Sequence, residues 1–257
     1  MGKKFIDLSI SIENGIKSDP PEMIPKIKYF GHDEGAEQMK QFFPGLDAAK
    51  DLPKGKGWAM EEISLTTHSG THLDAPWHYH PESEGKRALT IDEIPLEWCM
   101  GNGIKLDFRH FDDGYQVTCE DLEKAFREIG CEPGPGDIVL VNTGADEFWG
   151  KPEYLVKGCG FGRESTLWLT EKGVNVVGTD AWSWDIPLPF TAKEFSKTGD
   201  SSIIWEAHFA GIQKEYCHIE KLTNLDKLPS CGFKFFCFPV KIKGASGSWI
   251  RAVALIE

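Results

Sequence analysis

The chain has 257 residues, of which 40% are hydrophobic, and its formal net charge is −12. That length is enough for one large domain or two small ones, and the apolar residues can supply a substantial core. The acidic balance argues against binding to nucleic acid or anionic lipid, which needs a basic surface. Because no stretch approaches the ~18 apolar residues of a membrane span, we expect no membrane segment.

The cysteines and the N-terminal residues bear on the compartment. The N-terminal residues lack the apolar run of a secretory signal. Seven cysteines are scattered along the chain, and no pair has Cys-x-x-Cys spacing. An odd number of cysteines without a secretion signal predicts reduced thiols and a cytoplasmic location. Since no composition shift, linker or internal repeat divides the chain, we expect a single domain over residues 1–257.

The first quarter of the chain predicts two strands separated by a long insertion. Residues 5–12 alternate between apolar and polar side chains, the pattern of a half-buried strand. Residues 31–57 are mixed in composition and include an aromatic pair, Phe42 and Phe43. A segment of this length is often a lid or binding loop, and an irregular surface insertion is equally compatible. Residues 61–67 predict a short strand.

The middle of the chain alternates helices with strands. The clearest helix runs from Thr118 to Gly130, with a threonine cap and apolar residues at 3,4 spacing. Short or buried strands are predicted over 103–108, 138–141 and 174–177, and a second helix over 163–172. This alternation indicates the α/β class. Trp182 and Trp184 follow the last of these strands, where α/β proteins often bind ligands, and we expect at least one of them in the core.

Four of the eight histidines fall between residues 67 and 80. In an extended chain, even-numbered residues face one side. Gly70 allows close backbone approach, and Pro76 opposes a helix through this point. A histidine-rich polar turn is the alternative, but turns seldom collect so many ligand-type residues in phase. The even-numbered ligand-type residues are His68, His72, Asp74, His78 and His80.

This stretch resembles the cyclase-like metal-dependent hydrolases, a family that includes bacterial kynurenine formamidase, isatin hydrolase and cyclic-imide hydrolases. The family motif is His-x-Gly-Thr-His-x-Asp-x-Pro-x-His, and residues 68–78 match it at every position. The resemblance implies one compact α/β domain with a mixed, barrel-like central sheet and helices packed outside. Because such relatives are commonly dimers or tetramers, it also implies a homodimer or homotetramer.

The resemblance assigns roles to the motif residues. His68, His72 and Asp74 match metal ligands of the family, and His78 matches its catalytic acid–base. His80 has no motif role, and we expect it near the surface or behind the ligands. Three histidines outside the motif also have no expected role: His32, His110 and His218.

A second metal position is implied further along the chain. His208 lies in an expected helix start over residues 201–208, and Glu220 ends an expected strand over 217–220. His208 and Glu220 are twelve residues apart. Kynurenine formamidases carry a histidine and a glutamate at the same spacing as ligands of a second ion. Asp74 would then bridge the two ions. Single-metal relatives exist, so one ion and two ions both remain open.

Such a ligand set indicates hydrolytic chemistry. A divalent ion lowers the pKa of water toward ~7 and polarises a carbonyl oxygen. His78 lies beyond Pro76, so it can face the site without being a ligand and can return a proton to a departing nitrogen. Nitrogen and oxygen ligands without thiolate suit Mn²⁺ or Zn²⁺, with iron as a third candidate.

The implied reaction is hydrolysis of a carbon–nitrogen bond in a small-molecule amide. Formamidases of this family typically carry a substrate-contacting tryptophan in a Trp-Pro-Gly-Asp run near the N-terminus. Residues 17–21 read Lys-Ser-Asp-Pro-Pro instead, and no tryptophan precedes Trp58. This run and the long insertion look more like the isatin-hydrolase branch. We therefore expect the opening of a cyclic amide or imide, with N-formylkynurenine or a lactone as alternatives and with substrate-binding residues unknown.

Two other protein classes are compatible with parts of the sequence. Residues 78–84 contain His-x-His-x-x-x-Glu, an iron-site pattern of cupin-like oxygenases, but cupins are nearly all-β. A non-catalytic metal-binding module is the second alternative, although an intact His78 beside the ligands argues against it. The hydrolase hypothesis predicts that His80→Ala leaves most activity intact.

Overall fold

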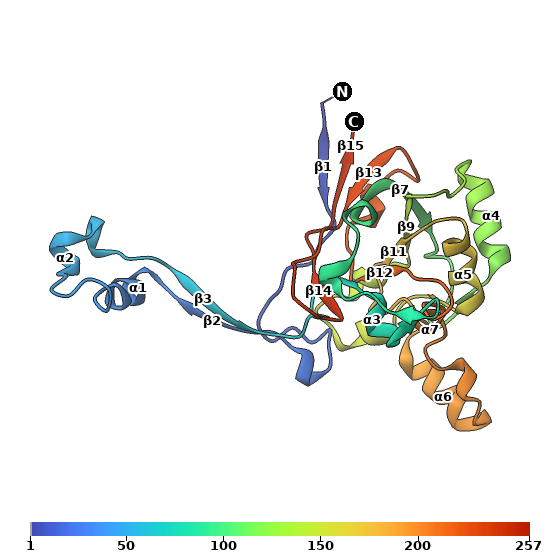
Figure 1. Ribbon diagram of the computed structural model, residues 1–257, viewed down its shortest axis with the longest axis horizontal. Coiled ribbons are helices and arrows are strands. Elements are labelled where there is room, and N and C mark those ends of the chain that lie inside the picture. The colour runs from blue at the N-terminus through green and yellow to red at the C-terminus, as the bar shows by residue number, and fades with distance from the viewer. Residues whose placement is uncertain (1) are drawn as a thin grey trace.

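Nine strands form the main sheet of the structure, a computed structural model that describes residues 2–257 (Figure 1). The central strands β7, β9, β11 and β12 run parallel, and the other neighbours pair antiparallel. The sheet curls into a half-barrel, so the expected mixed, barrel-like α/β fold is confirmed. In spatial order the strands are β1 (Lys4–Asp7), β15 (Val253–Ile256), β13 (Phe233–Phe236), β7 (Met100–Asp107), β9 (Ile138–Asn142), β11 (Val176–Thr179), β12 (Cys217–Glu220), β4 (His72–Asp74) and β14 (Gly247–Trp249).

The remaining elements lie outside this sheet. The helices are α1 (His32–Met39), α2 (Ala48–Asp51), α3 (Pro76–Tyr79), α4 (Cys119–Ile129), α5 (Arg163–Glu171), α6 (Leu188–Thr198) and α7 (Glu206–Ala210). Three two-stranded ribbons pair β2 (Lys26–Phe30) with β3 (Met60–Ser64), β5 (Glu82–Ser83) with β6 (Lys86–Arg87), and β8 (Gln116–Val117) with β10 (Gly160–Phe161).

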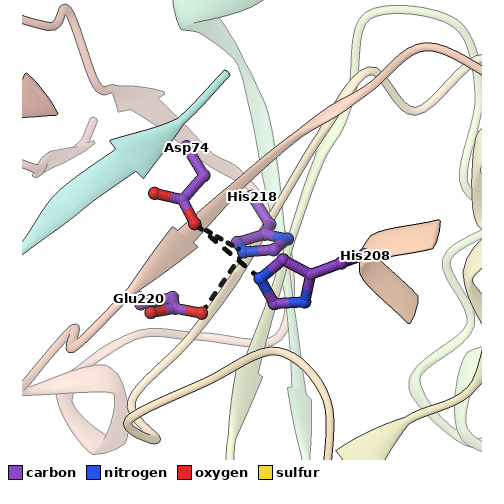
Figure 2. Close-up of side chains that lie close together, drawn as sticks. All are labelled: Asp74, His208, His218 and Glu220. Atoms are coloured by element: carbon purple, nitrogen blue, oxygen red, sulfur yellow. Dashed lines mark hydrogen bonds and ion pairs between the residues drawn. The ribbon is translucent and has the colours of Figure 1, made fainter. Parts of the chain in front are cut away.

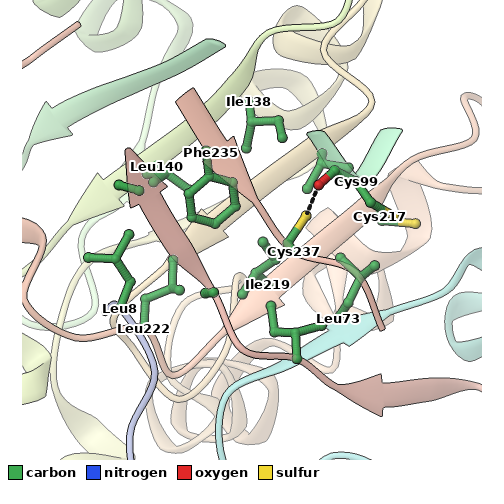
Figure 3. Close-up of a cluster of buried hydrophobic side chains, with 14 of the residues drawn as sticks. Leu8, Leu73, Cys99, Ile138, Leu140, Cys217, Ile219, Leu222, Phe235 and Cys237 are labelled. Carbon is green, nitrogen blue, oxygen red and sulfur yellow. Dashed lines mark hydrogen bonds between the residues drawn. The ribbon is translucent and has the colours of Figure 1, made fainter. Parts of the chain in front are cut away.

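Both faces of the central strands are buried. In β9, Ile138 and Leu140 belong to one apolar cluster, while Val139 and Val141 belong to a second cluster on the other face. Helices α4 and α5 pack over the second cluster (Figure 1). Each such side chain contributes about 1.5–3 kcal/mol when fully buried. Figure 3 shows the first cluster, to which strands and loops contribute Leu8, Leu73, Ile138, Leu140, Ile219, Leu222 and Phe235.

Helix α4 confirms the clearest sequence prediction. The hydroxyl of Thr118 accepts a hydrogen bond from the Asp121 amide, and the Asp121 carboxylate accepts one from the Thr118 amide. Leu122 and Phe126 are buried against the sheet. Gly130 ends the helix with a φ of 66°, a left-handed conformation that costs glycine little. The predicted strands at 138–141 and 174–177 and the helix at 163–172 are also present as β9, β11 and α5, within about two residues at each end.

Two predictions about local structure need correction, and one helix was missed. The strand expected over residues 5–12 stops at Asp7, because only β1 pairs with β15 before the chain leaves that edge. The helix expected over 201–208 is interrupted by Trp205, whose φ of 55° breaks the helical path, so α7 begins at Glu206. Helix α6 was not predicted, because most of its residues are exposed and it lacks a clear apolar stripe.

The cysteines also differ from expectation. Cys131 and Cys231 form a disulfide, so the prediction that the thiols are all reduced is wrong for this pair. The two residues are 100 positions apart, and only the fold places the end of α4 beside the loop before β13. Four of the five other cysteines are buried. Among residues 2–257, no helix is long and apolar enough to cross a membrane.

Residues 26–64 form an arm that projects away from the main sheet (Figure 1). Strands β2 and β3 make its ribbon, and α1 and α2 form its tip. The tip is closely packed, since a Cβ on Gly35 would lie 1.8 Å from the carbonyl oxygen of Trp58. The segment predicted as an insertion or lid, residues 31–57, is this tip. It lies well away from α7 and β12 of the same chain, so its role as a lid stays a prediction.

Candidate metal centre

The histidine-rich motif changes direction twice. Only its middle part is extended, as β4. Gly70, with a φ of 67°, turns the chain before this strand and brings His68 back toward it. Pro76 ends the extended part, but it also starts α3, because a missing N–H costs nothing in the first turn of a helix. The extended conformation expected from the even-numbered positions is therefore present only in β4. The ligand-type residues nevertheless come together, because the chain turns at Gly70 and again at Pro76.

Strand pairing places two further residues opposite the motif. In the antiparallel pair of β12 and β4, His218 faces Asp74 and Glu220 faces His72. Directly opposite residues project from the same face of a sheet. All four side chains are at most 9% exposed. The register of these two strands thus concentrates two imidazoles and two carboxylates in one buried place.

Asp74 is at the middle of this group. Its Oδ1 lies 2.7 Å from Nδ1 of His68 and 3.2 Å from Nε2 of His72. Its Oδ2 lies 3.0 Å from Nε2 of His218, 3.7 Å from Nε2 of His78 and 4.0 Å from Nε2 of His208. Each carboxylate oxygen therefore faces its own set of imidazoles, which is the arrangement expected of a bridging ligand.

Two histidines have their orientation set by hydrogen bonds on the far side of the ring. His72 Nδ1 is 2.8 Å from the carbonyl oxygen of Gly70, so Nδ1 carries the proton and Nε2 keeps a lone pair. Nδ1 of His208 is hydrogen-bonded to the carboxylate of Asp185. Carboxylate–histidine pairs of this kind orient metal ligands and raise their basicity. Both Nε2 atoms consequently face the centre.

Asp74, His208, His218 and Glu220 form one set of donor side chains. Figure 2 shows these four side chains pointing toward one another from β4, α7 and β12. One donor atom from each lies within 4.8 Å of the others. A second set with the same property contains His68, Asp74 and His78. The two sets share Asp74, as two neighbouring metal positions would.

The space around the set depends on β14. Gly247 pairs with Asp74, and a Cβ at this position would lie 2.7 Å from Cε1 of His68 and 3.0 Å from Oδ1 of Asp74. Any side chain here would displace those groups. The neighbouring Ser246 places its hydroxyl 2.9 Å from Nε2 of His68, so Nδ1 of that ring is the atom that faces Asp74.

The pKa shifts follow from burial and from these contacts. Burial opposes ionisation of Asp74 and Glu220, but the surrounding histidines hold the pKa of Asp74 well below its usual range and lower that of Glu220 to about 2. Burial also opposes protonation of His218, yet the hydrogen bonds that its ring donates to Asp74 and Glu220 raise its pKa to about 9. Burial lowers the pKa of His78 to about 4, assisted by the neighbouring His68.

The donor set fits a divalent cation. Nε2 of His72 and Oδ1 of Asp74 are buried without a hydrogen-bond partner within residues 2–257. Buried polar atoms that lack partners are costly, and an ion at this place would satisfy both. The donors are nitrogen and oxygen atoms without thiolate, a set that suits a divalent metal ion.

The structure brings together all six residues that the sequence suggested: His68, His72, Asp74, His78, His208 and Glu220. His80 points elsewhere, since its Nδ1 bonds the backbone of Glu82 in an exposed turn. His218 was missed. It lies two residues before Glu220 on an expected strand, and the alternation of side chains along that strand would have placed both on one face.

A cavity of about 460 Å³ opens onto the centre. His68, His78, His208 and Glu220 line its polar end. Its walls include Trp182 and Trp205, and Trp205 stacks on His208 with ring centroids 4.1 Å apart. Trp184, by contrast, is fully buried in the core, as expected for one of the two tryptophans. The other lining residues are Met23, Thr66, Ser183, Leu188, Ile204 and Lys221.

The sequence model of the family described as putative cyclase matches residues 6–186. The chain belongs to this family. Isatin hydrolase of Roseibium aggregatum is 27% identical over 237 residues, which cover 82% of this chain and 84% of that protein. Kynurenine formamidase of Bacillus thuringiensis (strain Al Hakam) is 26% identical over 208 residues, covering 76% and 83% respectively.

Solved structures of cyclase-family proteins share the fold. Isatin hydrolase A from Ralstonia solanacearum superposes with a TM-score of 0.75 at 22% identity, over 99% of this chain and 92% of that one. An isatin hydrolase bound to the product analogue thioisatinate gives a TM-score of 0.73 at 22% identity, with the same coverage. The match to the family model confirms the resemblance seen in the motif, and the two curated relatives named above are hydrolases.

Proposed function

We propose that this protein is a metal-dependent amidohydrolase that opens a cyclic amide or imide of isatin-like size. One observation carries the proposal: the cavity has apolar, aromatic walls and ends on a buried cluster of metal-ligand residues. Apolar pockets with a few convergent polar groups are typical sites for small organic substrates. The kinship with isatin hydrolase and kynurenine formamidase supports amide hydrolysis.

The residues divide into ligands and a proton carrier. His68, His72 and Asp74 would hold one divalent ion, with Asp74 shared with a second position at His208 and Glu220. Mn²⁺ or Zn²⁺ bound there supplies Lewis acidity toward a carbonyl oxygen and makes water more acidic. The buried carboxylates would balance the charge of the ion, and hydrogen bonds on the far side of the His72 and His208 rings hold both Nε2 atoms toward the site before substrate arrives.

His78 is the proposed acid–base residue. Its side chain is 25% exposed and lines the cavity, and its Nε2 lies 3.7 Å from Asp74 Oδ2. Its lowered pKa keeps the imidazole neutral near pH 7, the form that accepts a proton from the attacking water. The same nitrogen then returns that proton to the departing amide nitrogen, while the new carboxyl group leaves as product.

The choice of substrate class rests on the cavity wall near the N-terminus. In this chain Met23 lines the wall, and no tryptophan precedes Trp58. Trp182 and Trp205 both line the cavity, and we expect a flat bicyclic amide to pack against them without a further aromatic contact from that segment. N-formylkynurenine hydrolysis is the second candidate, favoured by the formamidase relatives, and a lactone is a third.

Location and partners complete the proposal. We expect a small-molecule substrate, a cytoplasmic protein and no binding to nucleic acid or membrane, in keeping with the net charge of −12. The Cys131–Cys231 disulfide is the observation that tests the location, because disulfides are rare in a reducing cytoplasm. Alkylation of thiols in rapidly quenched cells, followed by mass spectrometry, distinguishes the oxidised pair from the reduced one.

Proton release in a pH-stat tests the reaction. Chelator-stripped protein is reloaded with Mn²⁺ or Zn²⁺ and assayed in parallel on isatin, a cyclic imide and N-formylkynurenine. Metal-dependent acid release from a ring substrate supports the proposal, and activity on N-formylkynurenine alone replaces it with the second candidate. The reloaded His78→Ala variant is the control for acid released without enzymatic catalysis. Metal-loaded protein that is silent toward all three, and toward a lactone panel, contradicts a hydrolase.

A further inference from the structure

His218 has a geometry that the family motif does not explain. Its side chain is 0% exposed, and its Nε2 lies 3.0 Å from Asp74 Oδ2 and 3.3 Å from Glu220 Oε1. The ring stacks on Tyr79 with centroids 5.0 Å apart, and the backbone amide of His218 donates to the Tyr79 hydroxyl. The imidazole is therefore held with one edge toward two carboxylates.

The opposite edge of the ring decides which nitrogen carries the proton. The Tyr216 hydroxyl donates its only proton to the carbonyl oxygen of Ala207, at 2.8 Å. Its oxygen lies 3.3 Å from Nδ1 of His218, so Nδ1 must donate to it. In the neutral ring, Nε2 then presents a lone pair toward two negatively charged oxygens. Three electron-rich atoms converge here, and a positive charge must lie among them, either a proton on Nε2 that bonds both carboxylates or a metal ion in the place of that proton.

We propose that His218 is a direct ligand of the second divalent ion, in a four-residue set with Asp74, His208 and Glu220. This inference rests on the proposed function and extends it by one ligand. Bond lengths of about 2.0–2.2 Å place neighbouring ligand atoms roughly 3–4 Å apart. The Nε2 atoms of His218 and His208 lie 3.0 and 4.0 Å from Asp74 Oδ2, so the set needs little rearrangement (Figure 2).

Metal stoichiometry of the full-length protein tests the proposal. Stripped protein is titrated with Mn²⁺ and, separately, with Zn²⁺, and bound metal is measured by mass spectrometry after buffer exchange. Wild type is expected to hold two ions per chain, and His218→Ala and His218→Gln one. His80→Ala is the matched control, because it removes an imidazole from the same region without touching the cluster, and it should hold two.

The glutamine variant separates ligation from hydrogen bonding. Its amide can still donate to Asp74 and Glu220 but does not replace an imidazole lone pair. Loss of a residue that only orients ligands costs about 10–100-fold in affinity, so weakening beyond this range indicates a ligand. In copper-substituted protein, electron spin echo spectra should report one coordinated imidazole fewer than in wild type.

The outcomes are distinguishable. A His218→Gln variant that is folded by circular dichroism and still holds both ions with near-wild-type affinity overturns the proposal. A wild type that holds a single ion, unchanged in His218→Ala, also overturns it while leaving the hydrolase function intact. A wild type that binds no ion contradicts the proposed function itself.

Discussion

The arm and the metal centre are both built on an antiparallel strand pair, but their surroundings are opposite. All five residues of β3 are exposed, whereas every residue of β4 and β12 is buried. The pair at the centre lies inside a nine-stranded sheet, and the pair in the arm has no neighbouring strand. Charged groups interact strongly only where water is excluded. Strand pairing therefore sets which residues face one another, and burial decides whether they can do chemistry.

Removal of divalent ions should produce the largest difference between the metal centre and the arm. We expect hydrolysis to fall to background, because the water has no other activator, while amide exchange becomes faster in β4 and β12 and unchanged in β2 and β3. Ions present at 100 times their dissociation constant stabilise the folded chain by about 2.7 kcal/mol. Initial rates and hydrogen exchange measure both effects, with protein reloaded with metal as the control. Full activity in protein shown to be metal-free would refute the mechanism.

Removal of the His78 side chain should lower the rate of hydrolysis but leave metal binding unchanged. His78→Ala is expected to retain its metal and to lose turnover by about 10²–10⁴-fold, the usual contribution of a general acid–base. Metal analysis and steady-state rates on the same preparation provide the measurement. If the variant loses an ion, His78 is a ligand, which its place in the set with His68 and Asp74 also permits.

Two phenylalanine-to-alanine variants compare how much side-chain packing stabilises the core and the arm. Phe235 is 0% exposed in the core, and Phe42 is 69% exposed on the arm. Phe235→Ala should lower the free energy of unfolding by about 3–5 kcal/mol, because it leaves a cavity. Phe42→Ala should change it by less than about 0.5 kcal/mol, because most of that side chain is already in solvent. Urea unfolding measures both, and equal losses would show that the arm has a core of its own.

His80→Ala should have the smallest effect. Its ring bonds the backbone of Glu82 and lies outside the cluster, so we expect nearly wild-type rates and metal content. A large loss of activity would instead favour the cupin-like use of His78, His80 and Glu84. Oxygen consumption in iron-loaded protein would then be the measurement that decides between the two chemistries.

The sequence predicted local structure better than contacts between residues far apart in the chain. Helix α4 was predicted with its cap, its buried face and its glycine stop, because all three depend on residues within a few positions. The motif predicted which residues meet but not how, since Gly70 and Pro76 redirect the chain rather than keep it extended. The Cys131–Cys231 disulfide was not predicted, because 100 residues separate its partners.

The sequence by itself determined the chemical character of the centre. The imidazole and carboxylate groups of the motif, and the spacing of His208 and Glu220, already indicated nitrogen and oxygen ligands for a divalent ion. Only the tertiary structure decided that His218 faces Asp74, because this depends on the register between two strands more than a hundred residues apart. Only it decided that residues 26–64 project as an arm, since exposure depends on which neighbours a strand finds and not on the strand itself.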